Sequence, residues 1–176
     1  MLEEPPLRAD AARNRARILD AAEAVFAELG PTASTEEVAR RAGVAIGTVF
    51  RHFPTKDDLL AAIMKRLLAR LVEEAAEHDL FAFFTHVVAQ AAAKKTVVDL
   101  LPVDIRLAEA VGHLESAVGT LLAEAQASGA VHTGIRLPEV MALLVSVCQG
   151  ALHSGWDEDL QRRTLTVVFA GLRAQS

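Results

Sequence analysis

One short segment limits most strongly what this chain can fold into, because it combines a capped start, a glycine turn and a proline end. Ser34 is followed three residues later by Glu37, the capping-box pattern that opens a helix. Gly43 comes after the short helix that this start predicts, where a turn needs a positive φ. A second short helix is expected over about residues 45–53, and Pro54 ends it. Two short helices joined by a glycine-containing turn form a helix-turn-helix.

Apolar residues recur at helical spacing through the rest of the chain, and no alternation typical of a strand persists. Besides the two short helices, helices are expected over about residues 11–29, 55–78, 80–93, 95–101, 103–128, 138–155 and 158–174. The predicted fold class is therefore all-α with about nine helices. A disordered arm is expected over residues 1–10, a three-helix helix-turn-helix head over 11–54, and a helical bundle over 55–176.

Composition limits the class of protein and its compartment. Hydrophobic residues make up 52% of the chain and charged residues 23%, which is typical of a chain that forms a core. The single cysteine, Cys148, cannot form an internal disulfide, which fits a reducing compartment. The N-terminus lacks the layout of a secretory signal, and no apolar run reaches the roughly 18 residues of a membrane helix. We expect a cytoplasmic protein without a membrane contact.

The charge is distributed unevenly. A net charge of −5 speaks against nucleic-acid binding if it is taken over the whole chain. Residues 1–56, however, hold eight basic and eight acidic side chains, so the whole deficit lies in residues 57–176. An acidic body behind a locally basic head can keep DNA on one face only. Charge alone therefore neither predicts nor excludes DNA binding.

Three stretches of the head carry a more specific pattern. They read Arg15-Ala-Arg-Ile-Leu-Asp-Ala-Ala, Ser34-Thr35-Glu-Glu-Val-Ala, and Arg41-Ala-Gly-Val-Ala-Ile-Gly-Thr-Val-Phe-Arg-His-Phe-Pro-Thr-Lys56-Asp-Asp-Leu-Leu. Over about residues 13–60 the chain resembles the tetracycline-repressor (TetR-like) family. The resemblance implies a transcriptional regulator with a DNA-binding head, a connecting fourth helix, a ligand-binding core and a homodimer built on the last two helices. Its implied partners are double-stranded operator DNA and a small-molecule effector that releases the repressor, with no cofactor.

The second short helix is expected to enter the DNA groove. Arg can bind guanine bidentately, and the methyl groups of Ile and Thr suit the methyl group of thymine. We therefore expect Ile46, Thr48 and Arg51 to reach base edges, and Gly47 to let the backbone come close to DNA. Phe50 is also assigned to the DNA contact, although the family usually has Tyr there, so a phenol hydroxyl is missing. Ala45 stands where the family usually has Ser or Thr, which removes a helix cap.

Other residues of the head are better suited to phosphate. They are Arg15, Ser34, Thr35, His52 and Lys56. For Ser34, capping of the helix is an equally good interpretation, and both roles can hold together. Lys56 lies in the first turn of a helix, where the macrodipole disfavours a cation unless a phosphate lies there too; a solvated lysine is the alternative. Arg13 and Arg17 are expected on a solvated face.

The bundle is expected to hold an effector pocket and a dimer interface. The predicted pocket residues are Phe84, Val88, Leu101, Ile105, His113, Val118, Leu144, Cys148 and Trp156. Their apolar character favours a hydrophobic or aromatic effector, with core packing as the alternative for each residue. The last two helices are apolar nearly all round, which predicts burial on more than one side and an isologous dimer. The predicted interface residues are Val140, Leu143, Val147, Leu165, Val168, Phe169 and Leu172.

Two other classes of protein remain open from the residues alone. An enzyme is disfavoured, because Cys148 and His153 lie about 140° apart on one helix and cannot form a nucleophile–base pair. A metal site at Glu109 and His113 lacks a third ligand, so no metal is predicted. The other alternative is a helical adaptor, or a small-molecule-binding protein, that does not bind DNA.

Overall fold

The computed structural model describes residues 6–93 and 107–174. This part of the chain holds eight α-helices and a short 3-10 helix: α1 (Pro6–Leu29), η1 (Gly30–Thr32), α2 (Thr35–Ala42), α3 (Ile46–His52), α4 (Lys56–Ala75), α5 (Leu80–Ala93), α7 (Ala108–Ala127), α8 (Leu137–His153) and α9 (Glu158–Leu172). The described residues form no β-strand, only an isolated antiparallel bridge between Val131 and Arg173. The predicted all-α class is confirmed.

The start of the first helix differs from the prediction. Helix α1 begins at Pro6, so the described half of the expected disordered arm is helical. A proline is tolerated at the first position of a helix, because its N–H would have no intrahelical partner there and its φ is already helical. An ion pair between Asp10 and Arg13, one turn apart, supports the same segment. The helix expected over 95–101 lies outside the described residues.

The chain divides into two compact units, and the described part of the first is residues 6–65. Within it, α1 packs on α2 and α3. The buried residues of these helices include Ile18, Val25, Phe26, Val38 and Val49. Leu59, Leu60 and Ile63 of α4 are also buried, so the first part of α4 belongs to this unit. The unit thus ends within α4, beyond the boundary expected at residue 54.

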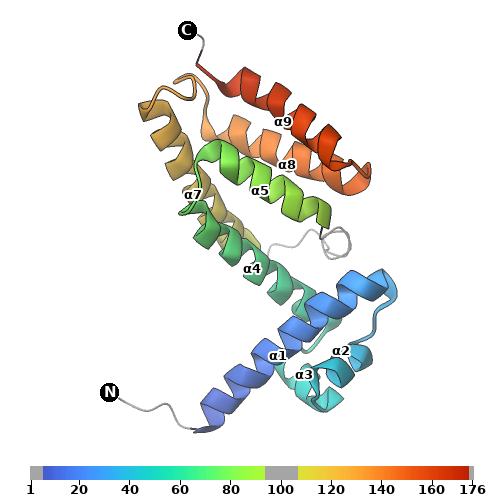
Figure 1. Cartoon of the computed structure of the whole chain (residues 1–176). Coiled ribbons are helices and arrows are strands. Elements are labelled where there is room, and N and C mark those ends of the chain that lie inside the picture. The colour runs from blue at the N-terminus through green and yellow to red at the C-terminus, as the bar shows by residue number, and fades with distance from the viewer. Residues whose placement is uncertain (1–5, 94–106, 175–176) are drawn as a thin grey trace. The chain divides into compact units, whose positions relative to one another are not determined.

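The described part of the second unit consists of residues 66–93 and 107–174. Helix α5 lies at its centre and packs against α7, α8 and α9, and Figure 1 shows α5, α8 and α9 side by side. Phe83, Phe84 and Val88 of α5 are completely buried. Because side chains this large fill the space between four helices, they stabilise the bundle through apolar burial. No described helix is long and apolar enough to cross a membrane.

Candidate functional site

The start of α2 has the cap that the sequence predicts, but only half of the expected capping box. The Ser34 hydroxyl accepts a hydrogen bond of 3.2 Å from the Glu37 N–H. The Glu37 carboxylate accepts instead from Arg40, with Nε and Nη2 at 2.8 and 2.6 Å. Its hydrogen bond with Arg40 lowers the pKa of Glu37. The charge of an adjacent guanidinium therefore outcompetes the backbone N–H for this carboxylate.

The turn after α2 depends on Gly43 and on an arginine from α1. Gly43 has φ 65° and ψ 39°, and its N–H donates to the Ala39 and Arg40 carbonyls. The Nη2 atom of Arg17 donates to the Ala42 carbonyl over 2.6 Å and lies 3.4 Å from the Gly43 carbonyl oxygen. Arg17 is exposed, as expected, but its guanidinium also caps the end of α2. Nothing in the sequence pairs Arg17 with a backbone carbonyl so far along the chain.

Helix α3 is held by one side chain and exposes most of the others. Val49 is its only buried residue. Ile46 and Phe50 are 36% and 42% exposed, and Gly47 and Arg51 are exposed as well. Thr48 and His52 are half-buried. All six predicted contact residues of α3 thus retain accessible surface. A Cβ atom on Gly47 would meet nothing within 4 Å, so the backbone is open there.

No side chain caps the start of α3. Ala45 precedes the helix with extended backbone, and its carbonyl accepts a hydrogen bond of 2.8 Å from the Thr48 N–H. A Ser or Thr hydroxyl at this position could accept a hydrogen bond from one of the first N–H groups of the helix.

The predicted phosphate contacts outside α3 lie in different surroundings. Arg15 is exposed, and its guanidinium lies 5.2 Å from the centre of the Phe53 ring. Thr35, the first residue of α2, is half-buried. The Lys56 ammonium donates to the Ala33 carbonyl over 2.9 Å and lies 5.3 Å from the centre of the Phe26 ring. Lys56 therefore links the start of α4 to the residue before the cap of α2, a role that the sequence pattern did not predict.

The predicted pocket residues do not share one environment. Phe84, Val88, Val118 and Leu144 are buried in the core of the second unit. Cys148 and Trp156 pack against this core, and burial raises the pKa of the Cys148 thiol to about 11. His113, which was also predicted to line the pocket, is exposed on α7. Leu101 and Ile105 lie outside the described residues.

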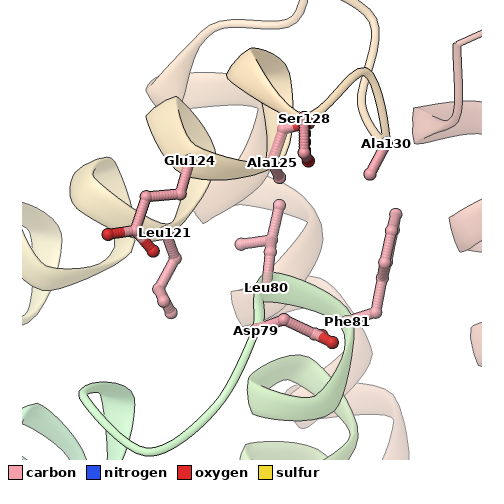
Figure 2. Close-up of a pocket in the computed structure, with 8 residues that line it drawn as sticks. All are labelled: Asp79, Leu80, Phe81, Leu121, Glu124, Ala125, Ser128 and Ala130. Carbon is pink, nitrogen blue, oxygen red and sulfur yellow. Dashed lines mark hydrogen bonds between the residues drawn. The ribbon is translucent and has the colours of Figure 1, made fainter.

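Hollows are present on the described surface of this unit, and two of them are well defined. Figure 2 shows one of about 330 Å³, in which Leu80 and Phe81 at the start of α5 face Ala125, Ser128 and Ala130. Asp79, Leu121 and Glu124 complete its lining. The other, of about 340 Å³, lies between α5 and α9 and is lined by Thr85, Ala89, Glu158, Gln161, Arg162, Leu165, Thr166 and Phe169. No predicted pocket residue lines either hollow.

Most of the predicted dimer residues pack in the core of the chain itself. Val140, Val147, Leu165 and Leu172 are buried. Leu143, Val168 and Phe169 are half-buried, and the Phe169 ring lies 4.8 Å from that of Phe81. The exposed apolar side chains of α8 and α9 are others: Val145 at 54%, Val167 at 73% and Leu160 at 38%. The apolar pattern on all sides of these helices predicted burial on more than one side. It did not show which residues pack in the core of the chain and which remain on its surface.

Two sequence models of protein families match the chain. The model described as "Bacterial regulatory proteins, tetR family" matches residues 18–63, which include the helix-turn-helix. The model described as "Transcriptional regulator SbtR-like, C-terminal domain" matches residues 74–174, more than half of the chain. The chain belongs to the TetR family of transcriptional regulators. The family consists of regulators rather than enzymes.

Individual TetR-family proteins resemble this chain over different shares of its length. A TetR transcription regulatory protein from Mycobacterium vanbaalenii is 37% identical, with a TM-score of 0.73, over 96% of this chain and 100% of its own. The HTH-type transcriptional repressor Rv3405c from Mycobacterium tuberculosis is 46% identical over 69 residues, or 37% of each chain. The FadR regulator from Bacillus subtilis, solved in complex with stearoyl-CoA, shares the fold with a TM-score of 0.66 at 20% identity, over 89% of this chain and 98% of its own.

Proposed function

We propose that this TetR-family regulator is a homodimeric repressor that binds operator DNA and is released by a small hydrophobic or aromatic molecule. The observation that carries the DNA-binding part is the exposure of α3, which buries only Val49. A helix that is anchored on one side and open on the other can enter the major groove. Arg51, Thr48 and Ile46 then reach base edges.

The phosphate contacts are proposed at the start of α2 and beside α3. The first N–H groups of α2 and the hydroxyls of Ser34 and Thr35 can donate to a phosphate at the positive end of the helix dipole. The Lys56 ammonium adds positive charge there, because its hydrogen bond to Ala33 holds it next to Ser34. Arg15 is exposed on α1, and His52 is half-buried on α3.

The DNA-binding proposal is tested by selecting an operator from random duplexes and measuring its affinity by fluorescence anisotropy. Arg51→Ala should relax the preference at one base position per half-site, because a bidentate contact with guanine is lost. Arg162→Ala is the matched control, since Arg162 is an exposed arginine of α9 paired with Asp159. Sequence-independent binding by the unmodified protein at low salt would refute the proposal.

The dimer is proposed on the exposed apolar residues of α8 and α9 rather than on those that the core already buries. Val167, Val145 and Leu160 leave apolar surface in water, and a second copy of the chain can cover it. Val167→Asp should produce monomers in sedimentation at micromolar concentration. Val111→Asp is the control, because Val111 is 37% exposed on α7, outside this face. An unmodified protein that sediments as a monomer contradicts the proposal.

Release by an effector is proposed from the apolar interior of the second unit and from the FadR relative solved with stearoyl-CoA. The effector must bind the DNA-free form more tightly, since equal affinity for both forms shifts nothing. A typical coupling of about 1–3 kcal/mol lowers operator affinity roughly 5- to 150-fold. Compounds that raise the melting temperature should be titrated against the protein–operator complex. Tight binders that leave operator affinity unchanged would refute the switch and leave DNA binding intact.

A further inference from the structure

The exposed face of α3 has two edges of different chemistry. With about 100° between successive residues, Gly47 and Arg51 lie opposite the buried Val49 and form the middle of the face. Ile46 and Phe50 lie next to each other along one edge, and Thr48 and His52 lie along the other. The middle is therefore open at Gly47, one edge is apolar and the other is polar.

The apolar edge of α3 carries most of the large exposed hydrophobic side chains in the described part of the first unit. The large exposed hydrophobic residues among the described positions of the first unit are Leu29, Ile46 and Phe50, and two of these three lie on α3. Phe50 has no hydroxyl, so it cannot donate a hydrogen bond to a phosphate or to a base. The apolar groups are also not needed to attach the helix, because Val49 is its only buried residue. Their chemistry suits an apolar group on the molecule that α3 contacts.

In the major groove the base edges present one apolar group, the 5-methyl group of thymine. We propose that Ile46 and Phe50 read the methyl groups of two thymines in each operator half-site, an inference that rests on the proposed DNA binding. Gly47 supports this reading, because the absence of a side chain in the middle of the face lets the helix lie deep enough for both edges to touch bases.

The spacing of the two residues limits where the thymines lie. Four residues of helix advance about 6 Å along the axis. Successive bases of one strand are about 3.4 Å apart. The two methyl groups are therefore expected about two base steps apart, with Arg51 directed to a guanine beside them. In this arrangement Ile46 and Phe50 recognise two positions of the operator without forming a hydrogen bond with a base.

The experiment replaces thymine by deoxyuridine, which removes the methyl group and keeps every hydrogen-bonding group of the base. An operator selected with the unmodified full-length protein is resynthesised with a single deoxyuridine at each thymine in turn. Burial of one methyl group corresponds to a three- to fivefold loss of affinity, so two positions per half-site should weaken binding by about that factor. Thymines that contact none of Ile46, Phe50 and the Thr48 methyl group should show no effect.

Protein variants assign each methyl group to a side chain. In Phe50→Ala the penalty should disappear at one of the two thymines, and in Ile46→Ala at the other, as a double-mutant cycle requires of a direct contact. Both residues are exposed, so the variants should keep the helical circular dichroism of the unmodified protein. Leu29→Ala is the matched control, because Leu29 is 48% exposed at the end of α1 and should leave both penalties unchanged.

The outcomes distinguish failure of the methyl reading by Ile46 and Phe50 from failure of the proposed DNA binding. Equal affinity for thymine and deoxyuridine at every position, with specific binding retained, overturns the reading by Ile46 and Phe50 alone. Penalties that persist in both alanine variants overturn it as well, because another group then contacts the methyls. Failure to select any DNA sequence overturns the proposed DNA binding itself.

Discussion

Gly43→Ala should destabilise the head for two separable reasons. The first is the backbone, since Gly43 has φ 65°, a conformation that costs an L-residue roughly 1–2 kcal/mol. The second is Arg17, because a Cβ atom at residue 43 would lie 2.9 Å from its Nη2 atom. Moving that guanidinium breaks its 2.6 Å hydrogen bond to the Ala42 carbonyl. For a partly exposed bond of this kind we take about 1 kcal/mol. The expected loss in free energy of unfolding is about 2–3 kcal/mol.

Two comparisons separate these contributions. Gly129 also has a positive φ, 75°, but a Cβ atom there would meet nothing within 4 Å, so Gly129→Ala carries the backbone cost alone. In the Arg17→Ala background the clash is removed, and Gly43→Ala should cost about 1 kcal/mol less than in the unmodified chain.

The measurement is urea denaturation of the full chain followed by circular dichroism. The single tryptophan, Trp156, lies in the second unit, so its fluorescence reports that unit and not the head. Equal costs of Gly43→Ala with and without Arg17 would refute the reasoning, since the guanidinium would then not be displaced. The operator affinity of Gly43→Ala should fall together with its stability, because the turn at Gly43 sets the position of α3 relative to α2.

Three further predictions concern single side chains. Lys56→Met should lower the stability of the head by about 1–2 kcal/mol in urea denaturation, because it removes the hydrogen bond to Ala33, whereas Lys65→Met on the exposed face of α4 should have little effect. Gly150→Ala should shift the fluorescence of Trp156 to the red, since the new Cβ would lie 2.6 Å from the indole ring, and Gly112→Ala, with nothing within 4 Å, should not. Burial raises the pKa of the Cys148 thiol from 9.0 to about 11, so the thiol ionises at a lower pH in the unfolded chain than in the folded one. The free energy of unfolding should therefore fall as the pH rises from 9.0 to about 11. In Cys148→Ala this fall should be smaller.

The fold was predictable because its signals are local. Helix starts and ends follow from caps, glycine and proline within a few residues, and these placed α2, α3 and the turn at Gly43 nearly where they lie. A local contact of the same kind lies at the start of α4, where the Thr55 hydroxyl accepts from the Asp58 N–H over 3.1 Å. Family resemblance then indicated the division into a DNA-binding head and a ligand-binding core.

The parts that the sequence did not predict depend on contacts between distant residues. Arg17 bonds to a carbonyl 25 residues away, and Lys56 to one 23 residues away. No periodicity encodes such pairs, because a backbone carbonyl is present at every residue. The same limit applies to α8 and α9: both have apolar residues on all sides, and only packing decides that Val147 is buried while Val145 remains exposed.

These intrachain contacts change the electrostatics of the head. Several basic side chains in the described part of the head bind partners within the chain: Arg13 pairs with Asp10, Arg40 with Glu37 and Arg41 with Glu28, whereas Arg17 and Lys56 bind backbone carbonyls. A cation that is paired with a carboxylate neutralises a phosphate less effectively, and the net charge of the chain is −5. Sequence-independent attraction to DNA should therefore be weak. Affinity for an operator must then come mainly from how α3 fits the groove, which places Gly47 and the two edges of α3 at the centre of recognition.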